Sequence, residues 1–201
     1  MLKKKFVPLL LASAAVLPML QGCIPVVAGG AAATGVAAAQ ERTVGGAVDD
    51  TTIWAEIKHH YIQADINELL EDVNVEVNEG RVLLTGSVRD PQTRVDAVKY
   101  AWKPNGVKEV INEINVTDKS SLKDLAKDTW ITTQIKSKFL LNQDIRSINY
   151  YVETINGVVY LLGVAQDQQE LDAATNLAST VNGVQRVISY MRMKDQYAPK
   201  I

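Results

Sequence analysis

Residues 79–86, EGRVLLTG, recur 77 positions later as residues 156–163, NGVVYLLG, and this repetition decides the fold. In each copy an apolar strand pattern runs between two glycines. Asn156-Gly157 is a typical hairpin-turn dipeptide, and Glu79-Gly80 occupies the same place in the first copy. Because three glycines with their apolar neighbours keep one register, the chain contains two copies of one module. The glycines are Gly80, Gly86 and Gly106 in the first copy and Gly157, Gly163 and Gly183 in the second.

The second copy reads as helix, strand, strand, helix, strand. Asp128 is expected to cap a first helix whose apolar stripe is Ile131, Ile135 and Phe139. Strands are expected over 148–154 and 158–164. A second helix then begins at Asp167 and ends at Asn182-Gly183, before a last strand over 184–193.

The first copy follows the same order. Its first helix carries Ile53, Ile57 and Tyr61, and Asp90-Pro91 is typical of the start of a second helix, which runs to about Trp102. Strands are expected over 73–77, 81–88 and 107–116.

Two strands joined by a tight turn are antiparallel, whereas a strand that follows a helical crossover is parallel to its neighbour. The sequence therefore predicts an α+β protein with two tandem modules, 44–117 and 118–201, each αββαβ with two helices on a mixed three-stranded sheet. The segment between the modules, 117–127, is short and polar, so the modules are expected to lie close together.

The N-terminus has the layout of an export signal. Lys3, Lys4 and Lys5 precede an apolar stretch that ends in Leu20-Gln21-Gly22-Cys23, which contains the only cysteine of the chain. This tetrapeptide resembles the bacterial lipobox, and the resemblance implies that the signal, 1–22, is cleaved and that Cys23 is acylated, palmitate being among the expected chains. The alternative is an ordinary signal peptide cleaved elsewhere.

The segment that follows, 23–43, is rich in alanine and glycine and is interpreted as a flexible tether, with an alanine-rich helix as the alternative. Without residues 1–22 the chain has 18 basic and 23 acidic side chains, a net charge of −5. This balance argues against nucleic acid as a partner. The charge is unequal between the copies: residues 44–117 have 7 basic and 13 acidic side chains, and residues 118–201 have 10 and 9.

The glycine pattern, with a Gly-Val before the last strand, resembles the BON domain, and two such domains behind a lipobox resemble the dual-BON outer-membrane lipoproteins. The resemblance implies a non-enzymatic protein without a cofactor, anchored by lipid in the outer membrane and facing the periplasm. It also implies binding of anionic phospholipid through the second domain and a part in envelope integrity, with the division site as one place of action. The glycines are structural in this family and are not lipid ligands. Partners among outer-membrane assembly or division proteins are the further expectation.

The first helix of the second copy is the candidate lipid surface. Trp130 suits the headgroup boundary because its ring is apolar and its N–H stays hydrated. The candidate residues are Trp130, Thr133, Gln134, Lys136, Ser137, Leu140 and Leu141. The alternatives are that Trp130 packs between the modules and that the two leucines belong to the core.

The last strand offers a second, weaker candidate. Arg186, Tyr190, Arg192 and Lys194 share one alternation phase and form a possible basic edge of the lipid site, or else a solvated strand face. A metal site is not expected, because the adjacent His59 and His60 point about 100° apart on a helix. No nucleophile–base pair indicates catalysis. A tethered adaptor for an outer-membrane assembly or cell-wall partner is the rival function.

Overall fold

The computed structural model describes residues 44–117 and 122–194. The expectations for the signal 1–22, for Cys23 and for the tether 23–43 lie outside these residues. Within the described ranges, no helix combines the length and the apolar character needed to cross a membrane.

The first module contains α2 (Val44–Gln63), α3 (Asn67–Glu71), β1 (Val73–Asn78), β2 (Arg81–Val88), α4 (Pro91–Ala101) and β3 (Glu109–Val116). The strand order is β1-β2-β3, with β1 antiparallel and β3 parallel to the central β2. The predicted mixed sheet is confirmed. The short helix α3 was not predicted, because five residues leave little periodic pattern.

The second module repeats this plan with α5 (Leu122–Leu141), the 3₁₀ turn η1 (Ser147–Asn149), β4 (Tyr150–Ile155), β5 (Val158–Ala165), α6 (Gln168–Ser179) and β6 (Arg186–Met193). Its strand order is β4-β5-β6, again antiparallel and then parallel. The first strand begins two residues later than predicted, because Ile148 belongs to η1. The last helix ends at Ser179, before the predicted Asn182-Gly183, with Thr180 as its cap residue.

A close backbone approach explains why the second glycine recurs in each strand pair. A Cβ atom on Gly86 would lie 2.0 Å from the carbonyl oxygen of Asp72, and one on Gly163 would lie 2.0 Å from that of Asn149. Both glycines also have positive φ angles, 128° and 143°. Only glycine fits at these two positions.

Each module has its own core between sheet and helices. Ile53, Ile57 and Tyr61 of α2 are buried against the first sheet, and Ile131, Ile135 and Phe139 of α5 are buried against the second. Asp90 and Asp167 cap α4 and α6 as predicted, each accepting a hydrogen bond from a backbone N–H of the first turn. The apolar stripes expected from the sequence are therefore the faces that fix the helices to their sheets.

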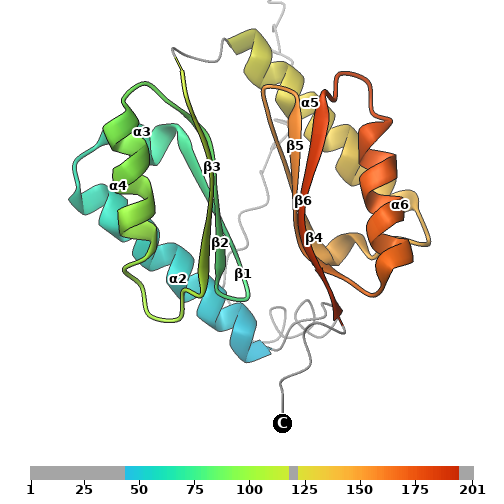
Figure 1. Cartoon of the computed structure of the whole chain (residues 1–201), viewed down its shortest axis with the longest axis horizontal. Helices are drawn as coiled ribbons and strands as arrows, with labels where there is room; N and C mark the ends of the chain where they lie inside the picture. The colour runs from blue at the N-terminus through green and yellow to red at the C-terminus, as the bar shows by residue number, and fades with distance from the viewer. Residues whose placement is uncertain (1–43, 118–121, 195–201) are drawn as a thin grey trace, which may run out of the picture.

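The modules pack sheet against sheet, with the helices outside (Figure 1). Leu83 and Ile111 of the first sheet form a buried cluster with Tyr160 and Leu162 of the second. The central strands are consequently apolar on both faces, since their alternate residues Val82 and Leu84, or Val159 and Leu161, enter the module cores. The molecule is therefore one packed body rather than two separate sandwiches.

Candidate functional site

A buried aspartate fixes α5 to the hairpin of its own module. Asp128 was predicted to cap this helix, but α5 begins at Leu122, so the N-cap prediction is wrong. The upstream residues are good helix formers and extend the helix by more than a turn. The Asp128 carboxylate instead accepts hydrogen bonds from the backbone N–H groups of Asn156 at 2.6 Å and Gly157 at 2.9 Å.

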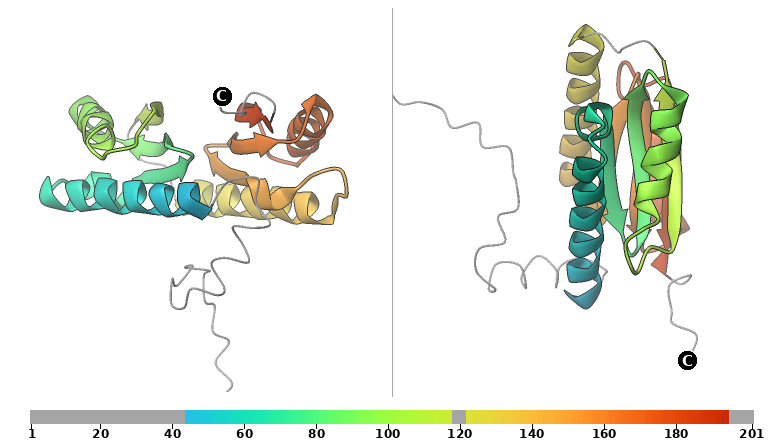
Figure 2. Two further views of the ribbon diagram at one scale, coloured as in Figure 1. Left: turned by 90° about the horizontal axis from the view of Figure 1, so that it is seen from below. Right: turned by 90° about the vertical axis from the view of Figure 1, so that its left-hand side faces the viewer.

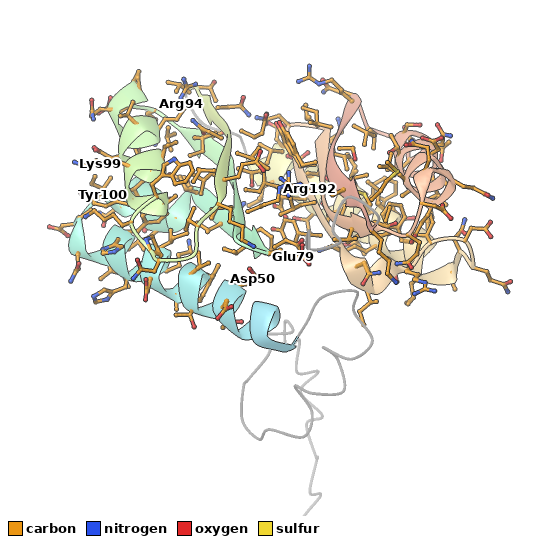
Figure 3. The ribbon with its side chains drawn as sticks, turned by 60° about the horizontal axis from the view of Figure 1, so that its bottom comes forward. Asp50, Glu79, Arg94, Lys99, Tyr100 and Arg192 are labelled. Carbon is orange, nitrogen blue, oxygen red and sulfur yellow. The ribbon has the colours of Figure 1, made fainter. Side chains whose placement is uncertain are left out.

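The first module has the same arrangement. Asp50 accepts hydrogen bonds from the N–H groups of Glu79 and Gly80 at 2.7 and 2.8 Å. Figure 3 shows Asp50 on α2 next to Glu79 at the turn between β1 and β2. These contacts set the rotation of α2 and α5 about their axes, and therefore decide which of their side chains face outward.

The outward surface of α5 contains large exposed apolar side chains. Trp130 is 50% exposed, Leu140 75% and Leu141 83%. Among the described residues the clusters of buried side chains, including the one that joins the modules, contain none of the three. The alternatives that placed the two leucines in the core are therefore not supported by the structure.

The seven candidate residues of α5 divide between two faces of the helix. Trp130, Gln134, Ser137 and Leu141 follow one another at intervals of three and four and form one flank. Thr133, Lys136 and Leu140 form another. The sequence had placed Lys136 near Trp130, but the two are six positions apart and point about 120° from each other.

Lys136 lies beside a recess between the modules. Its Nζ is 5.7 Å from the centre of the Tyr151 ring. The recess has a volume of about 440 Å³ and is also lined by Thr129 and Thr132 of α5 and by Glu71 and Asp72 of the first module. Lys136 is thus a cation next to carboxylates, while Trp130 is half-exposed on the other flank.

Two of the candidate residues on β6 face the other module instead of an open surface. The Tyr190 hydroxyl donates to the Glu113 carboxylate, and the Tyr190 carbonyl accepts from Arg81 at 2.7 Å. Arg192 lies 3.0 Å from the Glu109 carboxylate, between the modules in Figure 3. The expectation of a basic edge is corrected at these positions, because the sequence does not show which faces of the two modules meet. Arg186 and Lys194 are exposed.

Ionic contacts reinforce this interface. Glu109 lies between Arg81 at 2.7 Å and Arg192 at 3.0 Å, and hydrogen bonding to Arg81 holds the pKa of Glu109 below its ordinary value. Burial raises the pKa of Tyr160 to about 12, so this tyrosine is neutral at physiological pH. In the described part of the chain, no group of three or more His, Cys, Asp or Glu side chains is arranged to hold a metal ion.

Two mixed sheets with glycines at matched turns, packed back to back, define a protein of two tandem α+β modules. The chain belongs to the BON-domain family, whose model matches residues 49–118 and 127–195.

Its relatives include the outer membrane lipoprotein DolP of Haemophilus influenzae, which is 36% identical over 177 residues, 88% of this chain and 91% of that protein. An uncharacterized protein of Anaplasma centrale is 43% identical over 148 residues, 73% of this chain and 96% of that protein. The osmotically-inducible protein Y of Escherichia coli is 34% identical over 153 residues, 75% of this chain and 76% of that protein.

Proposed function

We propose that this protein is a non-enzymatic lipoprotein, anchored at Cys23 in the outer membrane and facing the periplasm, whose second BON domain binds anionic phospholipid through α5. The similarity to DolP supports the compartment and the anchor. A part in envelope integrity, with the division site as one place of action, belongs to the same proposal.

The single observation that carries the lipid-binding proposal is the exposure of Leu140 and Leu141 at 75% and 83%. Moving one leucine side chain out of water contributes about 2 kcal/mol. Two adjacent leucines at a helix end, with Trp130 on the same helix, form a surface that gains free energy at a bilayer interface. Acylation at Cys23 raises the effective concentration near the membrane, so this surface needs only weak affinity.

Charge supports the choice of the second module. Residues 118–201 have a net charge of +1, while residues 44–117 have a net charge of −6. An anionic surface attracts the former and repels the latter within a Debye length of about 8–10 Å. Lys136 and Lys138 are exposed on α5 itself.

The test uses residues 24–201, which lack the predicted signal and the acylated cysteine. Cosedimentation with vesicles of phosphatidylglycerol and phosphatidylethanolamine is expected, decreasing with added salt, and little with phosphatidylcholine vesicles. Leu140→Asp with Leu141→Asp, and separately Trp130→Ala, are expected to weaken binding at least tenfold. Val95→Asp is the control, because Val95 is similarly exposed, at 55%, but lies on α4. Equal binding by all variants contradicts the proposal.

A protein-interaction adaptor is the second candidate, and a surface on α4 favours it. Val95 is 55% and Trp102 50% exposed, and Arg94, Lys99 and Lys103 surround them. A basic and apolar surface in an otherwise acidic module fits an acidic protein partner, such as a component of an outer-membrane assembly or the division machinery. A photocrosslinking residue at position 95 that gives discrete protein adducts in cells, while the vesicle experiment is negative, would favour the adaptor.

A further inference from the structure

The first helix of the first module repeats part of the α5 surface. The helices align at an offset of 78 residues, so that Trp54, Lys58 and Ile62 of α2 correspond to Thr132, Lys136 and Leu140 of α5. We name these three residues the α2 stripe. Trp54 is 43% exposed and Ile62 60%. Their spacing of four residues places them along one side of the helix.

The helices α2 and α5 lie on the same side of the molecule. In both views of Figure 2, α2 and α5 are on the same side of the sheets, and α4 lies on the opposite side. In the left view α6 also lies opposite. The side of the molecule that carries α5 therefore carries α2 as well, and any flat partner that contacts one helix lies near the other.

The α2 stripe points away from α4. The opposite flank of α2 is marked by His60, whose ring stacks on Tyr100 of α4 with 6.4 Å between the ring centres. His60 is two positions from both Lys58 and Ile62, which corresponds to about 200° around a helix. The stripe thus lies on the flank of α2 that is turned away from α4.

An exposed acidic side chain of α2 lies away from the α2 stripe. The stripe contains no carboxylate, although its module has a net charge of −6. Glu56, an exposed acid of α2, is two positions from Trp54 and from Lys58, so it lies on the far flank. Lys58 donates to the Val73 carbonyl at 3.2 Å, and burial lowers its pKa. Because Lys58 is held within its own module, α2 contributes apolar contact rather than electrostatic attraction.

We propose that Trp54 and Ile62 insert into the same phospholipid bilayer as α5, so that the lipid-binding surface is a plane of two helices that spans both modules. This inference rests on the proposed function. The occupant is a bilayer because large apolar side chains are exposed on two separate helices on the same side of the molecule, and one extended apolar partner can contact both. The chain also enters the fold at α2, whose first residue, Val44, lies 21 positions after Cys23.

The experiment uses the absence of cysteine from residues 24–201. Single cysteines are introduced by Ile62→Cys, Leu140→Cys and Val95→Cys, and each is labelled with a fluorophore that shifts to the blue in an apolar environment. All three side chains are exposed, so the fold is retained, which circular dichroism verifies. The probe is a vesicle of phosphatidylglycerol and phosphatidylethanolamine.

Blue shifts at positions 62 and 140, with none at 95, support the two-helix plane. A shift at 140 alone overturns the inference and leaves the proposed function standing. No shift at any position means that the proposed function itself fails. A shift at 95 together with 62 shows that module one meets the bilayer without a preferred face, which also overturns the inference.

Affinity provides the second measurement. Trp54→Glu combined with Ile62→Glu is expected to weaken vesicle binding about tenfold, since it removes one of two linked contacts. Trp102→Glu combined with Val95→Glu is the matched control on α4, with similar exposure and the same change of charge. Equal loss in the two pairs would show that the effect is general repulsion from the anionic surface and would overturn the inference.

Discussion

At the scale of single residues, each copy of the module has a buried aspartate at the same position. Asp50 and Asp128 are 4% and 6% exposed, and each accepts two backbone hydrogen bonds from the hairpin turn of its own sheet. A turn of this kind leaves N–H groups pointing into the protein, where no water can accept from them. The aspartate supplies the acceptor and joins a helix to a strand pair distant in sequence.

Replacement of this carboxylate is expected to destabilise the second module. Asp128→Ala leaves the Gly157 N–H buried without its acceptor, at an expected cost of about 2–3 kcal/mol in the free energy of unfolding. Urea denaturation measures the loss. Asp172→Ala on the exposed face of α6 is the control and is expected to change stability by less than about 0.5 kcal/mol. Equal effects of the two substitutions would contradict this role for Asp128.

Residue patterns predicted Asp90 and Asp167 as helix caps correctly, because a cap and its partner lie within three residues of each other. The same reasoning failed at Asp128, whose partners are 28 and 29 residues away. A local sequence pattern does not indicate a contact between residues so far apart in the chain. The repeat itself carried a signal, since Asp50 and Asp128 occupy matched positions ahead of matched turns.

At the scale of elements, β4 contains a carboxylate whose charge is unfavourable in the fold. Burial raises the pKa of Glu153, and a hydrogen bond from Tyr151 and the charge of Lys136 offset this only in part, while Asp128 adds to it. Asn74 of the first module also donates to Glu153, at 3.4 Å. The contact between the modules therefore includes a partly buried acid whose charged form is unfavourable.

Glu153 is expected to make stability fall as pH rises. Between the ordinary pKa of 4.5 and the raised folded value, the folded state holds a proton that the unfolded state has lost. Stability therefore decreases as the pH passes upward through this window. Glu153→Gln removes the titration, so the melting temperature of the variant minus that of the parent is expected to be greater at pH 8 than at pH 5. A difference that is independent of pH would count against this.

Glu109 provides a comparison of opposite sign. Its pKa is lowered, first by hydrogen bonding to Arg81, so its contribution to stability is present above the unfolded pKa and is lost as pH falls through the folded value. The Glu109→Gln variant is therefore expected to melt at a lower temperature than the parent at neutral pH. The difference in melting temperature is expected to shrink in acid. Thermal melts over the same pH series distinguish the two carboxylates.

At the scale of the whole molecule, the modules are joined through the faces of their sheets. The contacts follow an approximate twofold relation: Asn74 and Glu76 of β1 correspond by the 77-residue offset to Tyr151 and Glu153 of β4. Asn74 donates to Glu153, while Glu76 contributes to raising the pKa of Tyr151, behind burial and Glu153. Such reciprocal pairing is what a self-complementary interface produces.

Unfolding is expected to be cooperative across both modules and to lose this property when the interface is charged. Leu162→Asp places a carboxylate at a side chain that is 0% exposed within the inter-module cluster, and the melting curve is expected to split into two transitions. Leu141→Asp makes the same change at a leucine that is 83% exposed and is expected to leave a single transition. Differential scanning calorimetry measures both.

Hydrophobic period and turn residues predicted the helices, the strands and the topology of each sheet. They did not predict the contacts between the modules. The strand run around Val82, Leu83 and Leu84 is apolar without interruption, which indicates burial on both faces but not what covers the second face. For that reason Tyr190 and Arg192 were assigned to a lipid edge although they contact the other sheet. On α5, Trp130, Leu140 and Leu141 are exposed, and their contact with lipid stays a prediction.

The back-to-back sheets have an evolutionary consequence. Within a duplicated gene, a substitution on the inner face of one copy meets the other copy directly, so the two inner faces have to change in step. The helices lie outside this interface, so their effect on one another runs through any partner that both of them contact. The matched inner positions already differ between the copies, since Leu83 corresponds to Tyr160 and Thr85 to Leu162.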